Sequence, residues 1–296
     1  MFKHFIVEEP KRLDKLLTEA FPDHSRSYFQ FLIERGLVTR EGKPLKKREI
    51  PSLGDEIKVF FMTSPEIELT PEEIPLDILY EDEWIICINK PAGMVVHPAP
   101  GHPTGTFVNA LLYHCRSLPP QDLRPGIVHR LDKETSGVLL AAKTVEAHQK
   151  LIDMFSERQM TKEYLAITVG SPGDQTVDLP IGRHPVNRKE MTVNEKGRSA
   201  ITHLETLQSK DGFSLVKAKP VTGRTHQIRV HLKAVKTPVL GDRTYGPEKL
   251  SNKLKIERQL LHAHRLSFSH PITGVRVEVE APIPEDFQKF FKTLDK

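Results

Sequence analysis

An arginine and an aspartate separated by one leucine are the residues of this 296-residue chain best placed to do chemistry. Arg130, Leu131 and Asp132 lie between residues 126–129, which we predict to be a short strand, and residues 138–142, which we predict to be a buried strand. On an extended backbone Arg130 and Asp132 point to one side and Leu131 anchors the other. A carboxylate presented in this way can act as a nucleophile or as a base. From the residues alone, a solvated surface turn is the alternative interpretation.

The composition limits the classes of protein to consider. The chain is long enough for a sizeable core, and its net charge of +4 and pI of about 8.9 permit nucleic acid as a partner without requiring it. Basic residues cluster at residues 40–48. Cys87 and Cys115 are far apart in sequence, which favours a reducing compartment. No segment approaches the roughly 18 consecutive apolar residues of a membrane-spanning helix, so we expect a cytoplasmic protein with no membrane partner.

The chain divides at residues 63–78, which are rich in proline and glutamate and predict an acidic linker. Residues 1–62 predict a small domain with two amphipathic helices and short strands. Residues 79–296 predict a larger domain of α+β class. Within it we expect strands near residues 84–88, 164–169, 214–218 and 275–279, and helices near residues 106–114, 145–158 and 226–235.

The sequence HRLDKETSG at residues 129–137 resembles the active-site signature of the RluA-type RNA pseudouridine synthases. Four further segments resemble motifs of this family in the same order: NKPAG at 89–93, TKEY at 161–164, GRTHQIRVHL at 223–232 and LLHA at 260–263. The resemblance covers residues 79–284 and implies a catalytic domain built on a mixed, mostly antiparallel β-sheet with flanking helices. Residues 1–62 resemble the S4-type RNA-binding domain through Arg12-Leu13-Asp14 and the sequence IERGLV at 33–38. Within the family the chain is most similar to the D-type enzymes of large-subunit rRNA.

The resemblance implies a role for each site residue. Asp132 corresponds to the catalytic aspartate, Arg229 to its paired arginine, and Tyr164 to the tyrosine on which uracil can stack. The implied substrate-binding residues are Arg130, Leu261, His129 and Thr135. The resemblance implies neither a metal nor a cofactor. The partners that it implies for the protein are RNA and the large ribosomal subunit or its precursor. We expect a monomer.

Three alternatives stay open at this stage. The synthase can act on tRNA, or the same fold can serve an RNA-binding ribosome-assembly factor. A metal-dependent hydrolase is the third alternative, since five histidines could bind a metal. It is remote, because these histidines lack the ligand spacing of zinc sites. These histidines are His129, His226, His231, His262 and His264.

Overall fold

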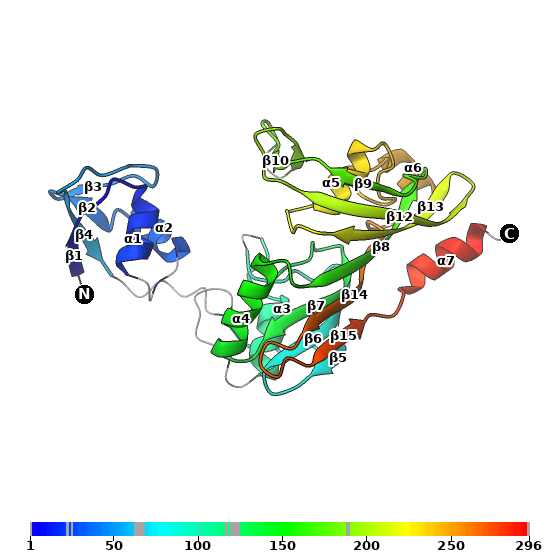
Figure 1. The fold of residues 1–296 in the computed structure, drawn as a ribbon, viewed down its shortest axis with the longest axis horizontal. Coiled ribbons are helices and arrows are strands. Elements are labelled where there is room, and N and C mark those ends of the chain that lie inside the picture. Colours follow the sequence, from blue (N-terminus) through cyan, green and yellow to red (C-terminus); the bar gives the residue numbers. More distant parts are fainter. Residues whose placement is uncertain are drawn as a thin grey trace. The chain divides into compact units, whose positions relative to one another are not determined.

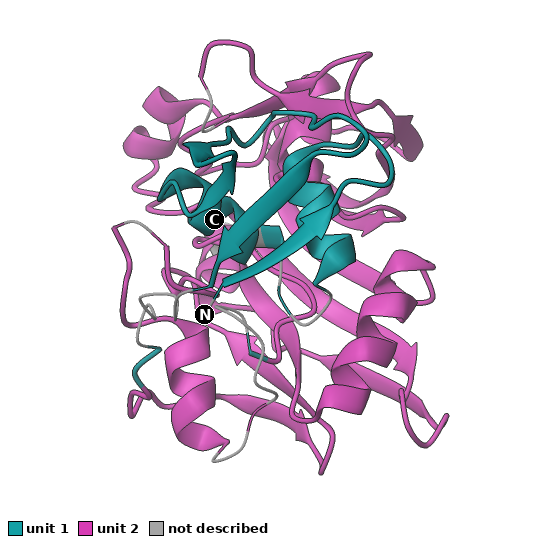
Figure 2. Ribbon diagram, turned by 90° about the vertical axis from the view of Figure 1, so that its left-hand side faces the viewer, with its two compact units in different colours: residues 1–70, 120–125 teal, residues 71–119, 126–296 magenta. Residues whose placement is uncertain are grey.

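The computed structural model describes residues 2–21, 24, 26–61, 69–99, 101–115, 118, 125–187 and 190–294. The chain forms two compact units, residues 1–70 with 120–125 and residues 71–119 with 126–296 (Figure 2). Of the predicted linker, residues 62–68 lie outside the described residues, and residues 71–78 belong to the larger unit. Within the described ranges, no helix combines the length and apolarity needed to cross a bilayer.

The smaller unit packs two helices on a four-stranded antiparallel sheet with the order β1-β4-β2-β3. Its elements are β1 (Phe2–Ile6), α1 (Leu13–Ala20), α2 (Arg26–Glu34), β2 (Val38–Arg40), β3 (Lys43–Pro44) and β4 (Glu56–Phe60). Helix α1 buries Leu13, Leu16 and Leu17, whose spacing puts them on one helical face. Strand β4 buries Ile57 and Val59, the alternation of a strand with one solvated face. The two patterns together supply one core.

The larger unit is built on a nine-stranded sheet with the order β5-β6-β7-β14-β8-β13-β12-β9, and β15 pairs with β14 (Figure 1). Every pairing is antiparallel except that of β7 with β14. The strands are β5 (Ile78–Glu81), β6 (Ile85–Lys90), β7 (Ser136–Ala142), β8 (Thr161–Val169), β9 (Gln175–Asp178), β12 (Ile201–Lys210), β13 (Phe213–Pro220), β14 (Leu261–Ser269) and β15 (Arg276–Glu280). A separate hairpin pairs β10 (Ile181–Arg183) with β11 (Met191–Val193). The helices are α3 (Phe107–His114), α4 (Val145–Ser156), α5 (Gln227–Ala234), α6 (Glu248–Lys253) and α7 (Glu285–Leu294).

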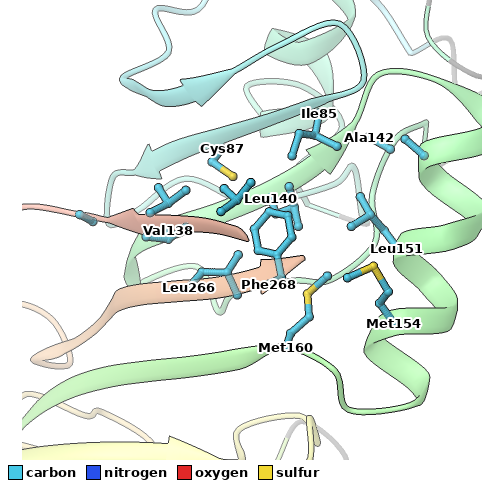
Figure 3. Close-up of a cluster of buried hydrophobic side chains, with 14 residues drawn as sticks. Ile85, Cys87, Val138, Leu140, Ala142, Leu151, Met154, Met160, Leu266 and Phe268 are labelled. Atoms are coloured by element: carbon cyan, nitrogen blue, oxygen red, sulfur yellow. The ribbon is translucent and has the colours of Figure 1, made fainter. Parts of the chain in front are cut away.

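Helix α4 holds one face of this sheet in place. Leu151 and Met154 of the helix belong to the same apolar cluster as Leu140 of β7 and Phe268 of β14 (Figure 3). The hydroxyl of Thr144 caps the helix by accepting a hydrogen bond from the backbone N–H of Ala147 over 3.2 Å. Strand β7, which directly follows the polar turn at residues 130–135, is buried along its whole length and is therefore a rigid support for that turn.

The parallel contact between β7 and β14 depends on a glycine. Gly137 has φ of 108°, and a Cβ there would overlap with the backbone carbonyl of Ala263. Only glycine lets the two strands approach this closely without strain. This contact brings the turn at residues 130–135 next to the start of β14.

The α+β class, with a mixed and mostly antiparallel sheet, is as predicted. The strand predicted at residues 126–129 is wrong, because only an isolated bridge between Ile127 and Ala141 forms there. The N–H of Leu140 on β7 is bound by a side chain instead of by the backbone of a neighbouring strand: it donates a hydrogen bond to Nε2 of His129 over 2.9 Å.

Candidate active site

The seven site residues predicted from the sequence all line one cavity of about 530 Å³ in the larger unit. They come from four separate parts of the chain: the turn before β7, strand β8, helix α5 and strand β14. These residues are His129, Arg130, Asp132, Thr135, Tyr164, Arg229 and Leu261.

The carboxylate of Asp132 is held by one arginine. Its Oδ2 accepts a hydrogen bond from Nη1 of Arg229 over 2.8 Å, and its side chain keeps 21% exposure to the cavity. Its Oδ1 lies 3.8 Å from Nε2 of His226, which is too long for a hydrogen bond. Among the described residues Oδ1 has no hydrogen-bond donor, so this oxygen is available to a bound molecule.

Arg229 is fixed from behind by a second carboxylate. Its Nε and Nη2 donate to Oδ2 and Oδ1 of Asp242 over 2.7 and 2.9 Å, which is the two-pronged geometry that arginine alone can make. Burial lowers the pKa of Arg229, but the hydrogen bonds and charges of Asp242 and Asp132 outweigh it and raise the pKa above its ordinary value. Burial likewise raises the pKa of Asp242, and the Arg229 guanidinium reverses that effect and lowers it. The pair is therefore a fixed ionic support for Asp132.

Tyr164 lies on β8 between Ala218 of β13 and Ala263 of β14. Its ring packs against the apolar clusters on both sides, and its hydroxyl makes no hydrogen bond within the described part of the chain. Burial and the charge of Asp132 raise the pKa of Tyr164 above its ordinary value, so the hydroxyl keeps its proton. Tyr164 thus offers an apolar ring face and a protonated phenol to the cavity.

Arg130 and Leu261 differ in exposure. Arg130 is exposed, and in the described ranges it has no ion pair, so its guanidinium is free to move into the cavity. Leu131, the residue between the two charges, is 5% exposed and belongs to the core, as its position in the sequence predicts. Leu261 is 3% exposed and forms an apolar part of the cavity wall.

His129 and Thr135 serve mainly to hold the turn. The ring of His129 stacks on Phe155 at a centroid distance of 4.9 Å, and burial lowers its pKa to about 3, which keeps the ring neutral. The Thr135 backbone N–H donates to the carbonyl of Asp132 over 3.1 Å, and its hydroxyl accepts from Gln259 over 2.7 Å. Both residues therefore position Asp132 from the protein side of the cavity.

Sequence reasoning missed three residues around Arg229. Asp242 and Tyr245 lie within residues 79–284, which the family resemblance covers, but the sequence assigned them no role, and it gave His226 no specific contact with Arg229 or Asp132. The hydroxyl of Tyr245 accepts a hydrogen bond from the N–H of Met191 over 2.8 Å and lies 2.8 Å from Nδ1 of His226. The guanidinium carbon of Arg229 lies 4.9 Å from the centroid of the Tyr245 ring. No spacing rule predicts these contacts, because Tyr245, strand β11 and helix α5 are separate parts of the chain.

Comparison with known proteins assigns the family. A family model described as RNA pseudouridylate synthase matches residues 84–234, which include Asp132, Tyr164 and Arg229, and an S4-domain model matches residues 11–57. The chain belongs to the RNA pseudouridine synthases. It is an enzyme that converts uridine to pseudouridine in RNA, and its N-terminal unit carries an S4 RNA-binding domain.

Individual relatives extend over nearly the whole synthase. The ribosomal large subunit pseudouridine synthase D of Escherichia coli is 42% identical over 96% of this chain and 90% of its own length. An uncharacterized RNA pseudouridine synthase of Bacillus subtilis is 42% identical over 98% and 96% of the two chains. The solved structure of human RNA pseudouridylate synthase domain containing 1 is 27% identical, covers 79% of this chain and 98% of its own, and superposes with a TM-score of 0.59.

The charge of the synthase cavity suits a polyanion. Among the described residues, six arginine and lysine side chains line it, and one carboxylate, that of Asp132, opposes them. The basic residues are Arg130, Arg158, Lys162, Arg198, Arg224 and Arg229. RNA presents one negative charge per nucleotide, so a basic cavity attracts it at long range.

The histidines that suggested a metal are used in hydrogen bonds. His231 contacts Thr202 and the carbonyl of Leu179, and His262 contacts Ser136. In the described ranges the one group with metal-ligand geometry is Glu81, His114 and Cys115, outside the cavity. The ammonium of Lys143 lies 2.7 Å from Glu81 and already neutralises that carboxylate.

Proposed function

We propose that this synthase isomerises uridines of large-subunit rRNA and that Asp132 is its catalytic carboxylate. The observation that carries the proposal is the pairing of Asp132 with Arg229, which occupies Oδ2 and leaves Oδ1 open to the cavity. A carboxylate facing a polyanion is unfavourable unless it takes part in the reaction. The names of the relatives support large-subunit rRNA as the substrate.

The reaction breaks the N1–C1′ bond of uridine and forms a C5–C1′ bond. Asp132 can attack C1′ through Oδ1 and release the uracil anion, after which C5 attacks C1′ and the carboxylate leaves again. Alternatively it removes the C2′ proton and returns it after the uracil has turned. In both routes C5 loses its proton and N1 gains one, so no redox partner or energy source is required. Arg229 serves both routes because its donated hydrogen bond favours the ionised carboxylate.

Tyr164 is placed to assist the uracil in this mechanism. Its ring face can stack on the detached base, which must rotate before C5 meets C1′. The phenol of Tyr164 is protonated, so it can act only as a proton relay. The hydroxyl donates its own proton to another group while it accepts the proton that leaves C5. The hydroxyl has no competing partner among the described residues.

The target uridine must leave its stack before its ribose can reach Asp132. Extruding a nucleotide costs a few kcal/mol. Arg130 is exposed at the cavity and can fill the vacated position with its planar cation, while Leu261 supplies an apolar wall for the base. One chain supplies all of these groups, so a monomer is sufficient. Cys87 and Cys115 are free and buried, as suits a protein of the cytoplasm.

The proposal is tested by mapping new pseudouridines in unmodified large-subunit rRNA and unmodified tRNA transcripts incubated with the full chain. A chemical adduct on pseudouridine stops reverse transcriptase and marks each position. New stops in the large-subunit rRNA that disappear with Asp132→Asn support both the substrate and the carboxylate. Stops confined to tRNA would refute the substrate, and full activity of Asp132→Asn would refute the mechanism.

The same variant separates catalysis from a role in ribosome assembly. Asp132→Asn keeps the size of the side chain and removes its charge. We expect it to bind the rRNA transcript at least as tightly as the wild type, because a negative charge facing the RNA is removed. A weakened complex would instead assign Asp132 to binding and favour the assembly-factor alternative.

A further inference from the structure

Three arginines of the cavity take no part in the chemistry proposed above. Arg158 follows helix α4, Arg198 precedes β12, and Arg224 lies between β13 and helix α5. All three line the cavity that contains Asp132. Burial lowers the pKa of Arg224, and the charges of Arg198 and Arg158 lower it further. Within the described ranges none of them has an acidic partner.

The backbone at Arg158 favours glycine, yet the residue is arginine. Helix α4 ends in a paired turn, with the N–H of Gln159 donating to the carbonyl of Met154 over 2.9 Å and the N–H of Arg158 donating to that of Phe155 over 3.4 Å. In this motif the residue after the cap is usually glycine, because its φ is positive. Arg158 occupies that position with φ of 62°. The residue that ends helix α4 in this turn therefore also lines the cavity with a cationic side chain.

Arg198 and Arg224 stand on loops that the interior holds in place. The backbone of Arg198 exchanges two hydrogen bonds of 2.9 Å with Ile181. The N–H of Arg224 donates to Oε1 of Gln227 over 3.0 Å, and Nε of Arg224 donates to the carbonyl of Ser199 over 3.0 Å. Gln227 is 4% exposed. The side chain of Arg224 is therefore held against Ser199, the residue that follows Arg198 in the chain.

We propose that Arg158, Arg198 and Arg224 together bind a phosphodiester of the RNA backbone beside the uridine that enters the cavity. The inference rests on the proposed function, which places that uridine at Asp132. Three cations without a counterion repel one another, and a phosphate relieves this repulsion while accepting their hydrogen bonds. A phosphodiester presents a negative charge and only acceptor oxygens, and both match arginines, which are cationic and offer only donors.

The test compares the salt dependence of RNA binding between variants of the full chain. The variant Arg158→Gln with Arg198→Gln removes two cations and keeps Arg224, whose Nε holds the loop at Ser199. Filter binding to an unmodified large-subunit rRNA transcript is measured from low to physiological salt. We expect the affinity to fall by about tenfold and the slope of log K against log salt to become shallower by roughly one.

A control uses Arg276→Gln, which removes a single exposed arginine of β15 that does not line the cavity. Equal slopes and affinities for the double variant and this control would overturn the proposal. Arg158→Lys with Arg198→Lys keeps both charges and should keep the slope, and a lost slope in that variant would also overturn it.

Thermal unfolding and isomerisation separate phosphate binding from a structural role of the arginines and from an incorrect substrate. Loss of the arginines should leave the thermal unfolding temperature unchanged or raise it, because like charges are removed; a lowered temperature with an unchanged slope would assign them a structural role. Isomerisation of the same transcript by the wild type reports separately on the proposed substrate. If the wild type does not isomerise this transcript, the proposed substrate is wrong. The salt slopes of the variants then still test whether the three arginines bind a phosphate.

Discussion

Arg229 donates a hydrogen bond of 2.8 Å to Asp132, a residue 97 positions earlier in the chain. The other edge of the same guanidinium is occupied by Asp242, which is 1% exposed. One cation therefore satisfies a carboxylate in the interior and a carboxylate in the cavity. The orientation of the cavity carboxylate consequently depends on the interior one.

Arg229→Lys should damage both stability and activity. A lysine cannot make the two-pronged contact with Asp242 and also reach Asp132, so Asp242 is left poorly paired in the interior. Breaking a buried pair of this kind costs about 3–5 kcal/mol. We expect a loss near the lower end in urea unfolding followed by Trp84 fluorescence, and a fall in the isomerisation rate of about a hundredfold or more.

A double variant separates these two effects. Arg229→Met with Asp242→Leu replaces both buried partners by apolar side chains and should recover part of the stability, because no charge is left unpaired inside the protein. Activity should stay low, since Asp132 still lacks its donor. Recovered activity would show that Arg229 acts only through the fold.

Tyr164→Phe should reduce the rate while leaving the fold intact. The variant keeps the ring that packs between β13 and β14 and removes the hydroxyl, which has no partner in the described structure. Loss of one proton-transfer group typically lowers a rate by about 10²–10⁴-fold. Release of tritium from C5 of uridine in the transcript measures the step directly. An unchanged rate would remove Tyr164 from the proton relay and leave it as a packing residue.

His129 should make the synthase less stable in acid. Burial lowers its pKa in the folded state to about 3, while the unfolded chain has a value near 6.5. Its contribution is fully present above pH 6.5 and is lost as the pH falls toward 3, because only the unfolded chain then gains the proton. His129→Gln retains an acceptor for the N–H of Leu140 and should show a shallower loss of stability between pH 6.5 and 5. Parallel stability profiles for the two proteins would contradict this assignment.

Asp14 should determine the stability of the smaller unit. Its carboxylate is fully buried and accepts hydrogen bonds from Arg12, Arg26 and Gln30. Burial raises its pKa, but these donors outweigh that effect and lower it, so the stabilisation is present above the pKa of the unfolded carboxyl, about 3.9, and is lost as the pH falls through the lower folded pKa. Asp14→Asn should cost about 3 kcal/mol, because two guanidiniums lose their counterion.

Hydrogen exchange of the amides in α1 and α2 measures this loss, since Trp84 belongs to the larger unit. Glu19→Gln is a suitable control because that side chain is 57% exposed. Equal protection in the two variants would mean that Asp14 contributes no net stability.

Local patterns in the sequence were sufficient to predict much of the fold. The helix at residues 106–114 forms as Phe107–His114, and Thr106 caps it through a side-chain hydrogen bond to Asn109. The buried strand after the polar turn forms as Ser136–Ala142. The prediction of a strand at residues 126–129 was wrong. The ring of His129, instead of a backbone carbonyl, accepts the hydrogen bond of Leu140, and strand propensities do not describe contacts of this kind.

By itself, the sequence determined the family motifs, the α+β class and the identity of the charged residues, because these follow from residue types and from periodicities of a few positions. Only the tertiary structure decided which groups meet. Strand order and loops of different elements bring Asp242 behind Arg229, and they bring Arg158, Arg198 and Arg224 to the wall of one cavity. The physical reason is that hydrogen bonds and charges act over a few ångströms in space, whereas sequence patterns describe neighbours along the chain.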